Sequence, residues 1–360
     1  MKKGLSAIEI RYLVSELKEL EGSKVAKIFQ PQRNEVYIQF YSAKTGKRML
    51  RIIIPGFIFL TDFKEESPQR PHGFLQSLRK WLEESRLKEI KQDGFERIVE
   101  FHFETNEGEF LLIVELFARG NMVLCKADKT IVACLESHKY KDRDIKPKSV
   151  YAFPKSAVDA STLTKAELMA LAEKTEKDAA SFLAAEIGLG GIYAEEICAK
   201  SGTEKSKKLD KADVEKVHKF IKELLNTAPK PQLITDPAFD AVPFDLSTYN
   251  DSKKEYFQSY NEALSRLLTT QTLERRQKDG KPSKERERLK KILDSQMEVA
   301  EVTEKEIIEC QKKAEIIYEH YLEIKEILDG VKKLTKDQIL KNYAKVTEVD
   351  LKNKTLILKV

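Results

Sequence analysis

A Glu-Arg dipeptide at the start of a predicted strand is the feature of this sequence richest in binding chemistry. Glu96 and Arg97 lie in the segment Gln92–Phe101, just before its alternating residues. Arginine presents a planar fork of donors that fits phosphates and base edges, and a neighbouring carboxylate can hold the fork or accept from a base or ribose. The ordinary alternative is a surface ion pair, which is nearly neutral energetically. On a strand the two side chains face opposite ways, so at most one belongs to the packed face.

Further basic and polar residues lie in the same part of the chain. Each is compatible with an ordinary surface position, but together they could follow a nucleic-acid backbone, because phosphate binding needs several cations on one face. The candidates that accompany the dipeptide in such a surface are Arg33, Arg79, Lys80, Arg86, Glu115, Arg119 and Asn121.

A glycine-rich turn is the second candidate site. Gly188, Gly190 and Gly191 lie between two predicted helices. Such a turn can direct backbone N–H groups at a phosphate, because helix N-termini favour anions. A plain turn between helices explains the same glycines equally well, and both interpretations stay open.

The composition limits the partners and the chemistry. Lys+Arg 64 against Asp+Glu 59 gives a net charge of +5, so any nucleic-acid surface must come from local patches. The four cysteines form no CxxC pair and the histidines show no zinc-ligand spacing, so we expect no metal site and no cofactor. The sequence has no GxSxG, phosphate-binding loop or dinucleotide motif, and a conventional enzyme is therefore not expected.

The sequence also bears on location. No segment approaches the roughly 20 apolar residues of a membrane span, and no apolar run of signal-peptide length follows the N-terminus. Sparse, unpaired cysteines suit a reducing compartment. We therefore expect a cytoplasmic protein with no membrane partner.

Residues 1–160 are predicted to form one α+β domain. Apolar spacing predicts a helix over 6–21, with Ser6 as its N-cap and Gly22 as its end. Two sets of short strands then predict two small antiparallel sheets. The strand sets cover residues 24–61 and 87–135, with helical spacing between them at 74–82.

The remaining chain is predicted to be mainly helical. Residues 161–228 are typical of a helix-hairpin-helix module, and the proline-containing stretch 229–250 is predicted to be a linker, because proline cannot continue a helix. Residues 251–330 carry an apolar stripe amid dense charge, which favours an antiparallel coiled-coil hairpin with a polar break at 278–283. This stripe can be satisfied internally or by dimerisation. Residues 331–360 are predicted to contain two short strands.

Several segments resemble the N-terminal domain of the NFACT family in order and spacing. They are Lys27-Ile-Phe-Gln-Pro, Phe74–Leu82, Gly94-Phe-Glu-Arg-Ile-Val-Glu-Phe and Glu115-Leu-Phe-Ala-Arg-Gly-Asn. Gly190-Gly-Ile-Tyr-Ala-Glu-Glu-Ile-Cys resembles the family's helix-hairpin-helix segment. The resemblance covers most of the chain and is strongest to archaeal members of this family, which includes bacterial RqcH and eukaryotic NEMF.

The resemblance implies a cytoplasmic, RNA-binding factor of ribosome-associated quality control. Such a factor binds large ribosomal subunits that still carry peptidyl-tRNA and recruits aminoacyl-tRNA for mRNA-independent C-terminal tailing, with alanyl-tRNA as one candidate. Peptide-bond chemistry stays with the ribosome. The family's C-terminal RNA-binding domain would follow the coiled coil and is expected to lie outside these 360 residues.

In the family, an Asp-Arg dipeptide of the N-terminal domain is needed for tRNA handling, and it corresponds to Glu96 and Arg97 of this chain. The acid is one methylene longer here. The charge pattern is kept, while tRNA choice and tailing activity are the properties that this departure puts in question.

Two other functions remain open from the sequence. Bacterial relatives sometimes carry a fibronectin-binding label, which would make the chain an adhesin, although a secretion signal is not seen. The N-terminal domain also resembles the β-rich domain of formamidopyrimidine-type DNA glycosylases. Those enzymes use an N-terminal Pro-Glu, where this chain has Lys2 and Lys3.

Overall fold

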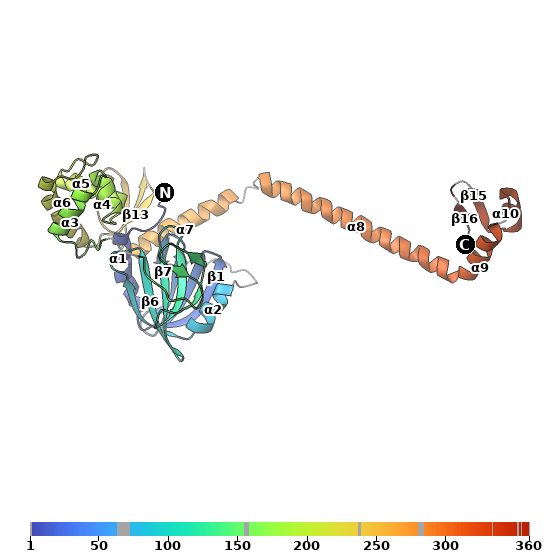
Figure 1. Ribbon diagram of the computed structural model, residues 1–360, viewed down its shortest axis with the longest axis horizontal. Helices are drawn as coiled ribbons and strands as arrows, with labels where there is room; N and C mark the ends of the chain where they lie inside the picture. The colour runs from blue at the N-terminus through green and yellow to red at the C-terminus, as the bar shows by residue number, and fades with distance from the viewer. Residues whose placement is uncertain are drawn as a thin grey trace. The chain divides into compact units, whose positions relative to one another are not determined.

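The computed structural model describes residues 2–62, 73–154, 158–236, 239–279, 284–332, 334–350, 353 and 355–359 (Figure 1). The chain divides into two compact units, Met1–Glu274 and Arg275–Val360, and each is described by itself. The candidate site lies entirely within the first unit.

The N-terminal helix begins where the sequence predicts. In α1 (Ala7–Leu17), Ser6 is the N-cap and accepts from the Glu9 backbone, while the Glu9 side chain accepts from the Ser6 backbone. This capping box satisfies two N–H groups that a helix start otherwise leaves without partners. A short 3-10 turn, η1 (Lys18–Leu20), continues the helix before Gly22 ends it with a positive φ.

The strands of the first unit form one large sheet, so the prediction of two small sheets is wrong in this respect. The two predicted strand sets join where β1 pairs with β5 at Lys24 and Arg86. This pairing satisfies backbone groups that two separate sheets would leave exposed at their edges. The antiparallel strands are, in spatial order, β4 (Phe57–Leu60), β3 (Gly46–Ile53), β2 (Glu35–Ser42), β1 (Lys24–Gln32), β5 (Arg86–Gln92), β6 (Ile98–Thr105), β7 (Gly108–Glu115), β8 (Asn121–Lys126) and β9 (Ile131–Cys134).

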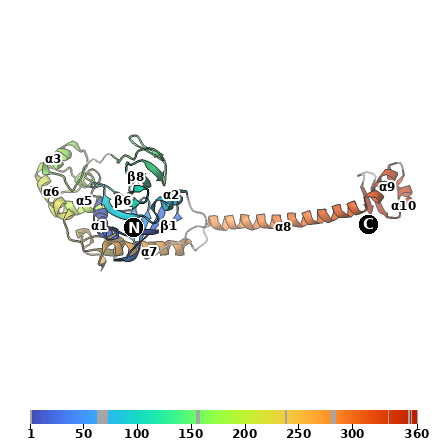
Figure 2. The ribbon, with the colours of Figure 1, turned by 90° about the horizontal axis from the view of Figure 1, so that it is seen from below.

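Three helices cover one face of this sheet: α1, α2 (Gly73–Leu82) and the first part of α7 (Tyr260–Asp279) (Figure 2). In α7, Tyr260, Leu264 and Leu267 are fully buried in this core. The Glu16 carboxylate of α1 accepts from the Tyr260 and Asn261 backbone N–H groups at 2.7 and 2.8 Å, which caps the start of α7.

This placement corrects the prediction that a coiled coil begins at residue 251. The apolar stripe at the start of α7 belongs to the core of the domain. Three- and four-residue spacing suits any helix that buries one face, so the pattern alone does not separate a core helix from a coiled coil.

The second half of the first unit is a helical module. It contains α3 (Lys165–Lys174), α4 (Ala179–Ala185), α5 (Gly191–Ser201) and α6 (Lys211–Leu225), close to the predicted helices. Their shared core includes Phe182, Tyr193, Ile197 and Val217, each 0 to 1% exposed.

The predicted linker at 229–250 is instead part of the packed domain. It contains β12 (Gln232–Asp236), β13 (Asp240–Val242) and the 3-10 turn η2 (Ser247–Tyr249), and β12 also pairs with β14 (Lys253–Tyr256). Pro231 and Pro243 flank the strands and offer only their carbonyls, to Phe257 and Lys230. Proline rules out a helix but is tolerated at strand ends, which is why the linker prediction was wrong.

The second unit contains a long helix and a small α/β cap. α8 (Lys284–Glu319) is followed by α9 (Tyr321–Val331), α10 (Lys336–Asn342), β15 (Val346–Asp350) and β16 (Thr355–Leu358). The two short strands match the prediction for this end of the chain, and α10 was not predicted. Apolar residues of α8 such as Ile292 and Ile307 are exposed. A coiled-coil partner for α8 stays a prediction, and residues 280–283 of the expected polar break lie outside the described residues.

None of the helices in the described residue ranges is both long and apolar enough to cross a membrane.

Candidate functional site

The Glu-Arg dipeptide lies in a tightly bonded turn between β5 and β6. The turn is closed by hydrogen bonds from Asp93 N to Ile98 O at 3.1 Å and from Glu96 N to Asp93 O at 3.0 Å. Phe95 is 3% exposed and anchors the turn in the core of the helical module. The Arg97 carbonyl accepts from Leu116 N, directly after β7, at 2.8 Å. The backbone beneath the two side chains is therefore held in place.

The side chains of Glu96 and Arg97 make no ion pair with each other, and among the described residues neither side chain has a hydrogen-bond partner. The surface ion pair that was the ordinary alternative is thus not formed. Burial lowers the pKa of the Arg97 guanidinium, an effect that the nearby Glu96 carboxylate partly offsets. Arg97 is an exposed cation, and no described residue occupies its side-chain donors.

A second carboxylate behind the turn gives a pH-dependent prediction. Burial raises the pKa of Asp93 above its ordinary 3.8, and the negative charges of Glu100 and Glu96 add to the effect. Ionised Asp93 therefore destabilises the fold at neutral pH, and this penalty disappears as pH falls through the raised pKa. We expect Asp93→Asn to stabilise the chain at neutral pH and to lose that advantage at about pH 3. Urea denaturation of both proteins across this range measures the difference, and a pH-independent difference would contradict the assignment.

The Glu96-Arg97 turn forms one wall of a pocket of about 640 Å³. The N-terminal segment and the turn between α4 and α5 form the other walls, so the two candidate sites of the sequence meet in one place. The pocket-lining residues used below are Lys2, Lys3, Glu9, Glu96, Arg97 and Tyr193.

The glycines of the α4–α5 turn also line this pocket. Gly188 and Gly190 have φ values of +79° and +86°, a region that favours glycine. Gly190 is the N-cap of α5 and has no side chain to cap it, so no side chain in the described part of the chain accepts from the first N–H groups of α5. With Gly191, they place the positive end of a helix on the pocket wall.

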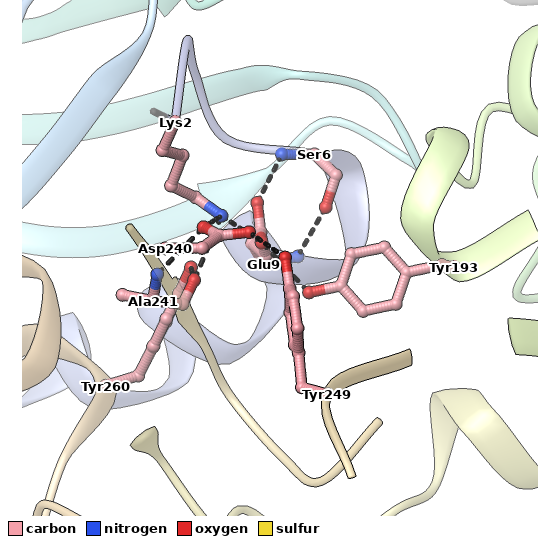
Figure 3. A network of polar contacts seen from close by, with 8 residues as sticks. All are labelled: Lys2, Ser6, Glu9, Tyr193, Asp240, Ala241, Tyr249 and Tyr260. Carbon is pink, nitrogen blue, oxygen red and sulfur yellow. Dashed lines mark hydrogen bonds and ion pairs between the residues drawn. The ribbon is translucent and has the colours of Figure 1, made fainter. Parts of the chain in front are cut away.

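Figure 3 shows a buried network of polar side chains, of which Lys2, Glu9, Tyr193 and Asp240 line the pocket. The Lys2 ammonium donates to Glu9 Oε1 at 2.6 Å, Asp240 Oδ1 at 2.8 Å and the Ala241 carbonyl at 2.9 Å. Burial by itself lowers the pKa of Lys2, but the two carboxylates outweigh it and the pKa is raised. Lys2 is thus protonated, with all three donors in use.

Three tyrosines complete the network. Tyr193 of α5 donates to Glu9 Oε1 at 2.9 Å, and Tyr249 of η2 donates to Asp240 Oδ2 at 2.9 Å. Tyr260 of α7 donates to the Ala241 carbonyl at 3.1 Å. Burial raises the pKa of Tyr193 well above its ordinary value, so its hydroxyl stays a donor. Sequence reasoning missed this network, since its partners are far apart in the chain and only the Ser6 cap marked its position.

The other basic candidates lie outside this pocket. Arg33 is exposed and pairs with Glu136 at 3.1 Å, and Arg79 donates to the Ile28 carbonyl at 3.0 Å. Lys80 and Arg86 line a different hollow of about 470 Å³, which also contains Glu104 and Glu107. The structure does not bring these four cations together with Arg97.

Two candidates use their polar atoms inside the domain. Glu115 is 1% exposed, forms an ion pair with Arg143 and accepts from the Tyr151 hydroxyl at 2.8 Å. Asn121 is equally buried and bonds the Glu136 backbone through both ends of its amide, at 2.8 and 3.1 Å. These burials do not support RNA contact by either side chain.

Arg119 is exposed in the turn between β7 and β8. Its neighbour Gly120 has a φ of +66°, and a Cβ there would lie 2.5 Å from Ile54 Cγ2, so the turn requires glycine. Arg119 does not line the pocket that contains Arg97.

Solved structures confirm the fold. The N-terminal region of the fibronectin/fibrinogen-binding protein from Streptococcus suis superposes with a TM-score of 0.60 at 21% identity, covering 74% of this chain and 100% of that one. The fibrinogen-binding protein from Staphylococcus aureus gives a TM-score of 0.59 at 19% identity, covering 73% and 98%. At this identity the similarity establishes the architecture alone.

Sequence relatives identify the family. The family described as NFACT N-terminal and middle domains matches residues 6–356, and the chain therefore belongs to the NFACT family. It is 29% identical to the "Archaeal Rqc2 homolog aRqcH" of Methanocaldococcus jannaschii over 98% of this chain and 55% of that protein. It is 31% identical to the human "Ribosome quality control complex subunit NEMF" over 41% of this chain and 14% of that protein. The chain thus spans about half the length of its archaeal relative.

Proposed function

We propose that this chain is an RNA-binding factor of ribosome-associated quality control, and that tRNA binds at the pocket that contains Arg97. The names of the archaeal and human relatives support the quality-control role. The observation that carries the RNA-binding part is that one pocket is lined both by Arg97, whose side chain has no partner among the described residues, and by the N-terminus of α5, which no side chain caps.

Each wall of the pocket suits a different part of a nucleotide. Arg97 would donate its fork to a phosphate or to a base edge, and Glu96 would accept from a base or ribose. The first N–H groups of α5, which begin at Gly191, would meet a phosphate, and the exposed Lys3 would add a second cation. The pocket thus combines contacts to the nucleic-acid backbone with contacts to a base.

The same geometry supports a role in positioning and selection, with peptide-bond chemistry left to the ribosome. The amine nearest the N-terminus that lines the pocket is Lys2, which is protonated and held by three acceptors. The Lys2 side-chain amine is thus committed to the fold, and it offers the glycosylase alternative no nucleophile in this pocket.

The wider proposal follows the family. The chain would act in the cytoplasm on large ribosomal subunits that carry peptidyl-tRNA. It would recruit aminoacyl-tRNA to them, alanyl-tRNA included, for C-terminal tailing. The glycine turn would belong to a helix-hairpin-helix module, and α8 would form the coiled coil that bridges the subunit or pairs with another copy. The adhesin alternative rests on the names of the two bacterial structures, whose similarity to this chain concerns the fold.

Sedimentation of the tagged chain with ribosomes tests this function. The chain is expected to sediment with large subunits in a sucrose gradient of cell lysate and to co-purify with a narrow set of tRNAs. Sequencing of the bound RNA would name the tRNA. Recovery of the protein only at the top of the gradient, without tRNA, would refute the proposal.

A further inference from the structure

We propose that the first turn of α1 positions both walls of the Arg97 pocket, through Tyr193 on one side and Gln92 on the other. This inference rests on the proposed function, because it assigns Tyr193 and Gln92 as positioning residues for RNA binding. Neither residue needs to touch the RNA. Each would act by fixing a group that does.

One tether holds the Arg97 turn to α1. The Gln92 side-chain amide donates to the Ala7 carbonyl at 3.0 Å and to the Glu96 carbonyl at 2.8 Å. A single amide group therefore connects the first residue of α1 with the residue next to Arg97. Loss of this group would leave the turn its own backbone bonds and the buried Phe95, but would remove its hydrogen-bonded link to the helix.

The other tether holds α5 to α1. Tyr193 is the third residue of α5, and its hydroxyl donates to Glu9 Oε1 at 2.9 Å (Figure 3). The opposite oxygen of the same carboxylate accepts from Ser6 N at 2.7 Å. The start of α5, with its uncapped N–H groups, is thus set against the start of α1. Arg97 and the N-terminus of α5 are each fixed to the same helical turn.

The ion pairs of Lys2 fix Glu9 itself. Lys2 joins Glu9 to Asp240 on β13, and its three donors all have acceptors. A Cβ on Gly56 would lie 2.8 Å from the Lys3 carbonyl, and Leu5 N donates to Gly56 O at 2.9 Å, so the backbone that carries Lys2 is closely packed. The Glu9 carboxylate therefore has little freedom to move.

The energetics favour a role in geometry over one in stability alone. Replacing a buried ion pair by apolar side chains of similar volume is often neutral or stabilising, so such a pair is weak support for a fold. A saturated network of directional bonds, in contrast, specifies one arrangement of the elements that it joins. In this chain the elements joined to α1 are the Arg97 turn and the start of α5, which line the pocket.

Tyr193→Phe and Gln92→Met test the inference, since each removes one polar group and nearly keeps the side-chain shape. Each variant is expected to bind tRNA about fivefold more weakly than the wild-type chain, the loss of roughly one hydrogen bond. The slope of log affinity against log salt concentration is also expected to become shallower, because fewer phosphates are contacted when the walls move apart. Fluorescence anisotropy with labelled total tRNA, across a salt series, measures both.

Glu35→Gln is the matched control, because it disturbs a different buried ion pair, with Arg51 at 2.7 Å, on a strand outside the pocket. Its thermal unfolding temperature is expected to fall at least as far as in the two test variants, with unchanged tRNA affinity and salt slope. Equal weakening in the control would show a purely structural effect and overturn the inference.

The outcomes separate this inference from the proposed function. If the wild-type chain binds tRNA and Arg97→Ala weakens it, while Tyr193→Phe and Gln92→Met bind as the wild type does, only the positioning role is refuted. If the wild-type chain does not bind tRNA, the proposed function fails, and this inference fails with it.

Discussion

Arg97→Ala is expected to weaken tRNA binding about tenfold to a hundredfold while the domain stays folded. Hydrogen bonds from a charged donor are worth about 1.5 to 3 kcal/mol, and each 1.4 kcal/mol corresponds to about a factor of ten in affinity. The fold should tolerate the change, because the Arg97 side chain has no partner among the described residues and the turn is held by its backbone. Anisotropy measures the affinity and thermal unfolding reports on the fold.

Two further variants make this prediction sharp. Arg33→Ala removes an exposed arginine whose partner is Glu136 and which lies outside the pocket, so its affinity should stay near that of the wild type. Arg97→Lys keeps the charge but loses the planar fork, and it should rescue the affinity only in part if the fork is used. Equal losses in Arg33→Ala and Arg97→Ala would point to a diffuse charge effect and contradict a local site.

Glu115→Ala is expected to lower the free energy of unfolding by about 3 to 5 kcal/mol, the usual effect of removing one partner of a buried ion pair. Arg143 is 8% exposed and lies over the ring of Tyr140 at 4.6 Å, so it has little access to water once its carboxylate is gone. Tyr151 would lose its acceptor as well. Urea denaturation followed by circular dichroism measures the loss.

Glu109→Ala is the control on the same strand. Glu109 pairs with Lys88 at 2.8 Å, but both side chains are about half exposed, and exposed pairs contribute little. Its denaturation midpoint should therefore stay close to that of the wild type. If the two variants were equally destabilised, burial of the Glu115–Arg143 pair would not be what stabilises this part of the domain.

Local signals in the sequence predicted the local structure well. The start of α1 follows from Ser6 and Glu9, which form a capping box three residues apart, and Gly22 ends this region with a positive φ. The strands were found from alternation between turn residues. The pairing that joins the two strand sets, at Lys24 and Arg86, was not predicted. The residues next to a strand do not determine which other strand it pairs with.

For the site, too, local features were predicted and long-range packing was not. The dipeptide of Glu96 and Arg97 and the glycines of the α4–α5 turn were identified from residue types and from resemblance. Their meeting in one pocket depends on packing between segments far apart in the chain. Glu115 was assigned to RNA for a related reason, because its position in a motif does not reveal that Arg143 lies opposite it in the core.

The pairing of β1 with β5 bears on how the domain folds. Every other neighbouring pair of strands in the nine-stranded sheet is consecutive in sequence. Such contacts close short loops and form quickly, whereas pairing across a long stretch of chain costs more loop entropy. Two local meanders can therefore assemble on their own, and the sheet becomes continuous only when Lys24 meets Arg86. That late step would also bring α1 and β5 together, and with them the two partners of the Gln92 amide.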